Sequence, residues 1–122
     1  MLVGAATVLT VSDIAASVAY YRDNLSFDVT FQYGEPTYYA CLCRDEVALH
    51  LRAARAPDWV AGRGAIAIFV DDVDALHSEF VKRGARIVKP PQDYPYGMRD
   101  FDVLDLDGNQ LTFGMESKPR AA

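Results

Sequence analysis

Two short segments carry the side chains best suited to chemistry. In RDFDVLD (residues 99–105) Asp100 and Asp102 alternate with apolar residues, and in VALHLR (residues 47–52) His50 and Arg52 do the same. This alternation is typical of a half-buried strand, so the members of each pair share one face of a sheet. Two carboxylates on a free face suit a cationic or amine-bearing ligand. Arg52 could instead neutralise them as an internal ion pair, and the sequence leaves both interpretations open.

Other reactive arrangements give weaker signals. Cys41 and Cys43 are the only cysteines, and two positions apart on a strand they are poorly placed to bridge each other. Free thiols are the simpler interpretation, and they favour a cytoplasmic protein. No Ser/His/Asp or Cys/His arrangement is evident, so we predict no catalytic residue. The Asp-rich run before Gly108 lacks the spacing and terminal Glu of a calcium loop, which favours a plain hairpin.

The composition indicates one soluble globular domain. The chain has 122 residues, 51% hydrophobic and 24% charged, which is enough for a single core without disulfides. Its net charge of −5 argues against a nucleic-acid partner, because such a partner needs a basic face. No apolar run approaches ~18 residues, and the start MLVGAATVLTV has no basic segment. We therefore expect neither a membrane span nor a signal peptide.

The first half of the chain predicts one helix among four strands. The helix begins after Asp13, a good N-cap residue, and its apolar stripe runs from Ile14 to about Leu25. The residues AARAPDWVAGR (53–63) break the periodicity and are interpreted as a linker. The strands are expected at residues 5–11, 27–33, 38–43 and 47–52.

The second half repeats this order. A strand is expected at residues 65–70, then a helix capped by Asp72 and ended by Gly84, then a short strand at 86–88. A Pro- and Tyr-rich loop follows, and residues 94–114 form a hairpin around the turn at 107–109.

Two offsets in residue number align the two halves of the sequence. Adding 59 carries Val11 onto Val70, and adding 62 carries Leu49 onto Leu111. The predicted fold is therefore α+β: a single domain, residues 1–122, of two βαβββ modules at about 1–56 and 62–117. Each helix would cover one face of its four-stranded sheet, and the free faces would curl into a cup-shaped mixed sheet.

The cup is the predicted binding groove, because a groove should be concave and carry a few placed polar groups. Aromatic side chains on the strands, with Trp59 at the rim, would stack on a flat heteroaromatic ligand. His50 is either a groove-lining residue or a hydrogen-bond partner of the ligand. The predicted ligand-binding set is Tyr33, Tyr39, His50, Arg52, Trp59, Phe69, Tyr96, Met98, Asp100, Asp102 and Thr112.

Two segments carry a family resemblance that covers nearly the whole chain. With the paired modules, VSDIAASVAYYRDNLSF (11–27) and YGMRDFDVLDLDGNQLTFG (96–114) resemble the vicinal oxygen chelate superfamily, which includes glyoxalase I, extradiol dioxygenases and fosfomycin resistance enzymes. The hairpin looks most like that of the bleomycin resistance branch. Leu106 stands where many relatives have Pro, a minor departure.

The resemblance also places the superfamily's four metal-ligand positions on this sequence. They fall on Ala6, His50, Ala65 and Thr112. A divalent metal needs three or more N or O ligands, and only His50 is a good one. We therefore expect no metal and no cofactor.

By resemblance, we expect a homodimer that binds a planar or cationic drug-like molecule and sequesters an antibiotic without altering it. The main alternative is an enzyme of the same superfamily, with an atypical metal site or none, that acts on a small carbonyl or aromatic substrate. His50 is the feature that favours this alternative. A third interpretation, an accessory module without a ligand, predicts a cup filled by its own aromatic side chains.

Overall fold

The computed structural model describes residues 1–117 and has the α+β fold that the sequence predicts, with two βαβββ modules. The predicted domain also included residues 118–122, which lie outside the described residues. The first module contains β1 (Thr7–Val11), α1 (Ile14–Asp23), β2 (Asp28–Tyr33), β3 (Tyr39–Arg44) and β4 (Val47–Ala53). The second contains β5 (Ala65–Phe69), α2 (Val73–Lys82), β6 (Arg86–Asp93), β7 (Met98–Leu104) and β8 (Gln110–Glu116).

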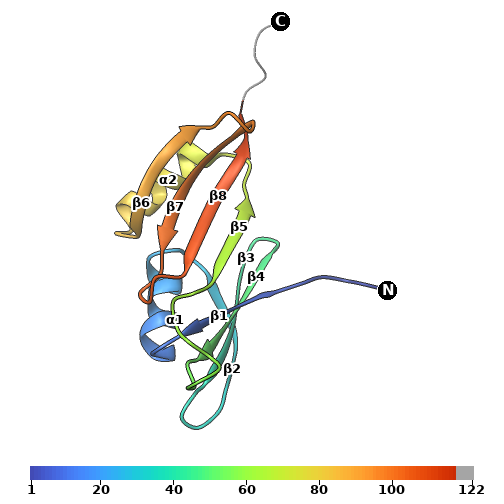
Figure 1. The fold of residues 1–122 in the computed structure, drawn as a ribbon, viewed down its shortest axis with the longest axis vertical. Helices are drawn as coiled ribbons and strands as arrows, with labels where there is room; N and C mark the ends of the chain where they lie inside the picture. Colours follow the sequence, from blue (N-terminus) through green and yellow to red (C-terminus); the bar gives the residue numbers. More distant parts are fainter. Residues whose placement is uncertain (118–122) are drawn as a thin grey trace, which may run out of the picture.

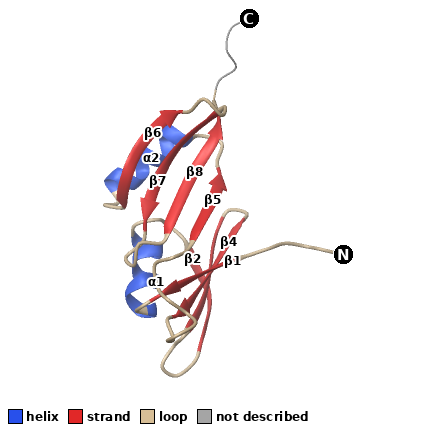
Figure 2. Cartoon of the chain, in the orientation of Figure 1, coloured by secondary structure: helices blue, strands red, loops and turns tan. Residues whose placement is uncertain are grey.

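Each module forms its own four-stranded mixed sheet, and the two sheets have the same topology. The strand orders are β1-β4-β3-β2 and β5-β8-β7-β6, with the first pair parallel and the others antiparallel. Figures 1 and 2 show the sheets following one another along the long axis of the chain, each with its own helix beside it. Neither helix among residues 1–117 is long and apolar enough to cross a membrane.

Both helices begin where the sequence predicts. The carboxylates of Asp13 and Asp72 accept hydrogen bonds of 3.0 Å from the amides of Ala16 and Ala75, so each satisfies a donor that the first turn leaves free. Gly84 follows the second helix with φ +72°, a conformation that glycine adopts without strain.

One strand is longer than the sequence prediction. A strand at residues 86–88 followed by a loop was expected, but β6 continues to Asp93 and includes Pro90 and Pro91. The prediction is wrong because β6 is an edge strand with an irregular register, where a missing N–H costs no ladder bond. The extension places Lys89 on the sheet, paired with Asp102 of β7.

The two faces of each sheet differ sharply. The face under the helix is apolar and buried, as at Leu49 and Leu111, which are both 0% exposed. The opposite face carries large exposed side chains, among them Phe31, Tyr33 and Phe69. We call these helix-free surfaces the open faces of the first and second sheets.

A buried polar network joins the modules at the β7–β8 loop. The hydroxyl of Tyr21 donates to Asp105 at 2.9 Å, and the amide nitrogen of Asn109 donates to Asp105 and to the Thr10 carbonyl. The side chains of Asp105 and Asn109 are fully buried. Because buried polar groups are costly unless paired, this network fixes the two modules relative to each other.

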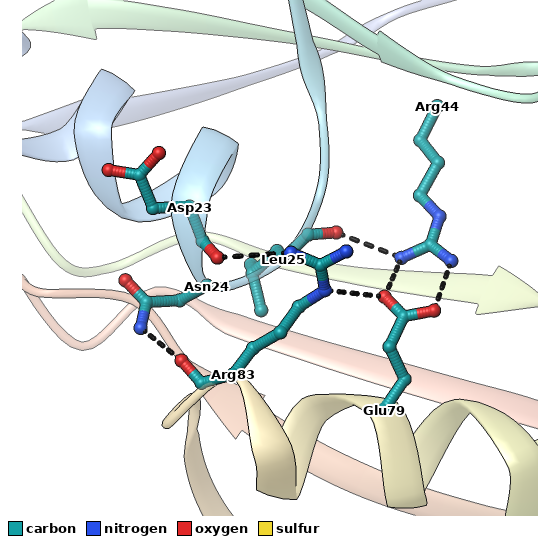
Figure 3. Close-up of polar contacts among 6 residues, drawn as sticks. All are labelled: Asp23, Asn24, Leu25, Arg44, Glu79 and Arg83. Atoms are coloured by element: carbon teal, nitrogen blue, oxygen red, sulfur yellow. Dashed lines mark hydrogen bonds and ion pairs between the residues drawn. The ribbon is translucent and has the colours of Figure 1, made fainter.

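A second polar link crosses between the modules at α2 (Figure 3). Arg44 of β3 makes two hydrogen bonds to Glu79 of α2, of 2.8 and 2.9 Å, and also donates to the Leu25 carbonyl. Arg83 donates to the same carboxylate, while its own carbonyl accepts from Asn24 of the first module. Because a planar guanidinium can bind a carboxylate through two parallel hydrogen bonds, Arg44 fixes the position of β3 relative to α2.

Candidate functional site

On the first open face, strand pairing brings predicted residues side by side. Arg52 of β4 lies opposite Thr10 of β1 and Tyr39 of β3, and Tyr39 lies opposite Tyr33 of β2. His50 is opposite Cys41 in the next row. Residues paired across strands share a face, so the structure gathers Tyr33, Tyr39, His50 and Arg52 on one surface.

Two side-chain contacts organise this face. The Tyr39 hydroxyl and Nδ1 of His50 are 2.8 Å apart and hydrogen-bonded, with the rings edge to face. Arg52 donates to the Thr10 hydroxyl at 2.8 Å, and its guanidinium lies 4.3 Å from the centre of the Trp59 ring. The guanidinium of Arg55 lies 4.2 Å from the centre of the same ring, so two cations stack on one indole at the rim of the sheet.

The second open face is built around a lysine. Nζ of Lys89 lies 2.7 Å from the Asp100 carboxylate and 3.6 Å from that of Asp102. Asp100 also accepts from the Tyr96 hydroxyl at 2.7 Å, and Asp102 accepts from the Thr112 hydroxyl at 2.7 Å. Tyr96 and Thr112, which were both in the predicted set, thus donate to Asp100 and Asp102, whereas Lys89 was not in that set.

The cation that pairs with these carboxylates differs from the one considered from the sequence. Arg52 was the candidate internal partner, but its guanidinium contacts Thr10 of the first module and Trp59 of the linker. Lys89 takes that role, and it was missed because the strand that carries it was expected to end at residue 88. The alternating pattern around Arg86–Asp93 is interrupted by two prolines, so the only available signal was the charge itself.

The charges on this face stabilise one another. Burial alone lowers the pKa of the Lys89 ammonium, but its hydrogen bond to Asp100 and the nearby carboxylates raise that pKa overall. Burial likewise raises the pKa of Asp100, and the hydrogen bonds from Lys89 and Tyr96 outweigh it, so the pKa lies below its ordinary value. The ion pair is therefore fully formed across the neutral pH range.

Aromatic rings flank the lysine. Nζ of Lys89 lies 4.2 Å from the centre of the Tyr94 ring, and Tyr94 and Tyr96 stack with centroids 5.1 Å apart. A carboxylate pair beside an aromatic face is the arrangement that recognises an ammonium group. In this chain, Lys89 supplies that ammonium.

The remaining predicted residues of this face lie around Gly114. Phe69 of β5 and Asp100 of β7 are its cross-strand partners, and the Phe69 side chain is 77% exposed. A Cβ at Gly114 would lie 3.1 Å from Cβ of Asp100 and 3.5 Å from Cε of Met98. Glycine at this position therefore lets Met98 and Asp100 approach the middle of the sheet.

The predicted set falls into two groups, one on each sheet. Within residues 1–117, no side-chain hydrogen bond, ion pair or ring contact joins the open face of one sheet to that of the other. The contacts between the modules lie instead at the β7–β8 loop and at α2. The role of these residues in ligand binding stays a prediction.

Comparison with known proteins identifies the fold. The family model for the Glyoxalase/Bleomycin resistance protein/Dioxygenase superfamily matches residues 5–113. The chain belongs to this superfamily. The resemblance drawn from the two sequence segments is therefore confirmed. No curated protein matches the chain.

Solved structures of the superfamily fold are similar over nearly the whole length. A bleomycin-binding protein from Streptomyces verticillus, solved with copper(II)-bleomycin, has 28% identity and a TM-score of 0.79, covering 97% of this chain and 98% of that chain. A glyoxalase/bleomycin resistance protein from Catenulispora acidiphila has 28% identity and a TM-score of 0.77, covering 95% and 100%. TioX from Micromonospora, at 24% identity and a TM-score of 0.77, covers 92% and 97% and shares the fold.

The residues at the superfamily's metal positions do not fit a divalent metal. The side chains of Ala6 and Ala65 have no atom that can bind a metal, and the Thr112 hydroxyl is hydrogen-bonded to Asp102. Nδ1 of His50 is hydrogen-bonded to Tyr39. Among residues 1–117 there is no group of three or more His, Cys, Asp or Glu side chains arranged to hold a metal ion.

Proposed function

We propose that this protein binds a planar, cationic, drug-like molecule and sequesters it without chemical change, as an antibiotic-binding protein. The observation that carries the proposal is the similarity to the bleomycin-binding protein of Streptomyces verticillus over 97% of this chain. The poor fit of the metal positions supports it, because the metal-dependent chemistry of the superfamily needs ligands that Ala6 and Ala65 cannot provide.

Aromatic side chains on the open faces are the proposed stacking surface. Phe31 and Tyr33 are 55% and 57% exposed and lie with their rings stacked, 6.3 Å apart. Tyr96 on the second sheet is 63% exposed. Exposed rings held by rigid strands offer contact area to a flat ligand at little cost in side-chain entropy.

The proposed charge preference rests on the second open face. Asp100 and Asp102 together exceed the single charge of Lys89, so this surface keeps an excess negative charge. A ligand cation would share the two carboxylates with Lys89 or displace it. Molecules without a positive charge would lack this interaction and bind more weakly.

We further propose that the binding groove forms in a homodimer. The two groups of site residues lie on separate sheets, and the polar links between the modules at Asp105 and Glu79 involve neither group. The open face of one chain's first sheet would then meet the open face of the partner's second sheet. Such a groove would combine Trp59 and Arg52 from one chain with Asp100 and Tyr96 from the other.

An enzyme without a metal is the second candidate. The hydrogen bond between Tyr39 and His50 favours it, since a paired Tyr and His on an open surface can donate and accept a proton. This candidate predicts that a bound molecule leaves the protein chemically altered.

Fluorescence of Trp59, the single tryptophan, tests the proposal. Metal-free bleomycin should quench it saturably at one molecule per chain, in protein stripped of metal with EDTA. Asp102→Asn should weaken the quenching, whereas Asp58→Asn, the same change in the exposed linker, should not. Quenching that appears only after Zn, Mn, Ni or Fe is added, and that His50→Ala abolishes, would contradict the proposal.

A further inference from the structure

We infer that a cleft between the two modules is a second binding site, which takes an organic cation with an apolar body. The cleft has a volume of about 520 Å³, within the range of roughly 300–1,000 Å³ typical of small-molecule sites. It lies between the β3–β4 turn of the first module and the β5–α2 connection of the second, beside the Arg44–Glu79 link of Figure 3. Phe69 is the one predicted open-face residue that also lines it.

The cleft exists because the two hairpins differ in length. The β7–β8 loop has five residues between Leu104 and Gln110, whereas the β3–β4 turn has two between Arg44 and Val47. This difference of three is the difference between the two repeat shifts, 59 and 62. The longer loop fills the space beside the β1–α1 connection, where Asp107 accepts hydrogen bonds from the amide of Ser12. The shorter turn leaves the equivalent space open.

The floor of the cleft is apolar for a related reason. Adding 59 to the residue number carries Tyr21 onto Phe80. Tyr21 donates its hydroxyl to Asp105 beside the β7–β8 loop, whereas Phe80, its counterpart in the cleft, has no hydroxyl. Phe80 is fully buried, and Ile68 and Phe113 beside it are 6% and 3% exposed. Above this buried floor, Phe69 lines the cleft and is 77% exposed, so an apolar group that entered would pack against it and lose contact with water.

The rim of the cleft is acidic. Its lining has one basic residue, Arg44, and Arg44 is already bound by two hydrogen bonds to Glu79. With that pair neutralised, four lining carboxylates remain without a lining cation to balance them. A cationic head group is attracted to such a rim and an anionic one is repelled. The four are Asp45, Glu46, Asp71 and Asp72.

A matched pair of probes tests the charge preference. By calorimetry, 1-naphthylmethylamine should bind about tenfold more tightly than the neutral 1-naphthalenemethanol. The difference should shrink as ionic strength rises from about 0.01 M to about 0.1 M, because the Debye length falls from about 30 to about 10 Å. In amide NMR spectra, the amine should shift the signals of residues 44–47 and 68–72.

Two variants locate the site. Ala75→Leu adds bulk at an exposed helix position that lines the cleft and should reduce amine affinity at least about fivefold. Its control is Ala16→Leu, the exposed residue of α1 that corresponds to Ala75 under the 59-residue shift and lies away from the cleft. The double variant Glu46→Gln/Asp71→Asn should weaken amine binding about three- to tenfold and leave alcohol binding unchanged.

Three results would overturn the inference. The first is equal affinity for the amine and the alcohol, and the second is an equal loss of amine affinity in Ala75→Leu and Ala16→Leu. The third is a shift of the NMR signals of residues 44–47 that depends on protein concentration alone, which would assign the cleft to a second copy of the chain. None of these results would alter the quenching of Trp59 by bleomycin. The cleft and the proposed antibiotic site therefore fail or succeed separately.

Discussion

Tyr21 of α1 and Asp105 of the β7–β8 loop form a buried hydrogen bond of 2.9 Å that joins the two modules. Burial and the neighbouring carboxylate raise the pKa of this tyrosine well above its ordinary value, so its hydroxyl stays protonated and remains a donor at neutral pH. The pair therefore serves as a permanent tie between elements 84 residues apart in sequence.

Removing this tie should destabilise the whole chain. Tyr21→Phe keeps the buried ring but leaves Asp105 one donor short, so we expect a loss of about 1–3 kcal/mol in the free energy of unfolding by urea. Tyr33→Phe, the same change at an exposed position, should alter it by less than about 0.5 kcal/mol. Equal losses in the two variants would show that the junction contributes no special stability.

Lys89 should have opposite effects on stability and on ligand binding. Lys89→Met leaves Asp100, whose side chain is 8% exposed, without its cation. We therefore expect the free energy of unfolding to fall by about 1–3 kcal/mol, which lies between the values for exposed and buried ion pairs. The same variant frees two carboxylates and should bind cationic ligands more tightly than the wild type. Lys82→Met, on the exposed end of α2, is the control and should change neither property.

If Lys89→Met weakened cation binding, the lysine would be part of the ligand contact and the carboxylates would not be the attracting groups. Adding Asp100→Asn to Lys89→Met should restore part of the lost stability, since the uncompensated charge is then absent.

The ion pair also predicts a pH dependence. The pKa of Asp100 is lower in the folded chain than the value of about 3.9 expected when unfolded, so its contribution is present above that value and is lost as pH falls through the folded pKa. The stability difference between wild type and Asp100→Asn should therefore be constant from about pH 6 to pH 9 and shrink below about pH 4. A difference that grew on acidification would mean that the folded carboxyl is protonated more easily than the unfolded one.

The repeat made most of the fold predictable from the sequence. Asp13 and Asp72 recur at equivalent positions and cap equivalent helices, and the alternation around Leu49 and Leu111 fixed which side of each sheet is buried. These are local signals, set by capping chemistry and by the two-residue period of a strand.

What the sequence did not predict depends on contacts between distant segments. Pro90 and Pro91 obscured an edge strand, and with it the place of Lys89 beside Asp100. The Asp-rich hairpin turn was expected correctly, but its partner, Tyr21, lies in the other module and no local pattern identifies it. The three-residue difference between the repeat shifts was visible, but only the assembled modules place the resulting space beside Phe80.

The fate of the bound molecule tests the central claim most directly. The EDTA-treated protein would be equilibrated with metal-free bleomycin in a dialysis cell, then denatured, and the released molecule measured by mass spectrometry. We predict that one bleomycin is retained per chain and that its mass is unchanged. Release of a molecule with an altered mass would contradict sequestration and favour an enzyme of the same superfamily.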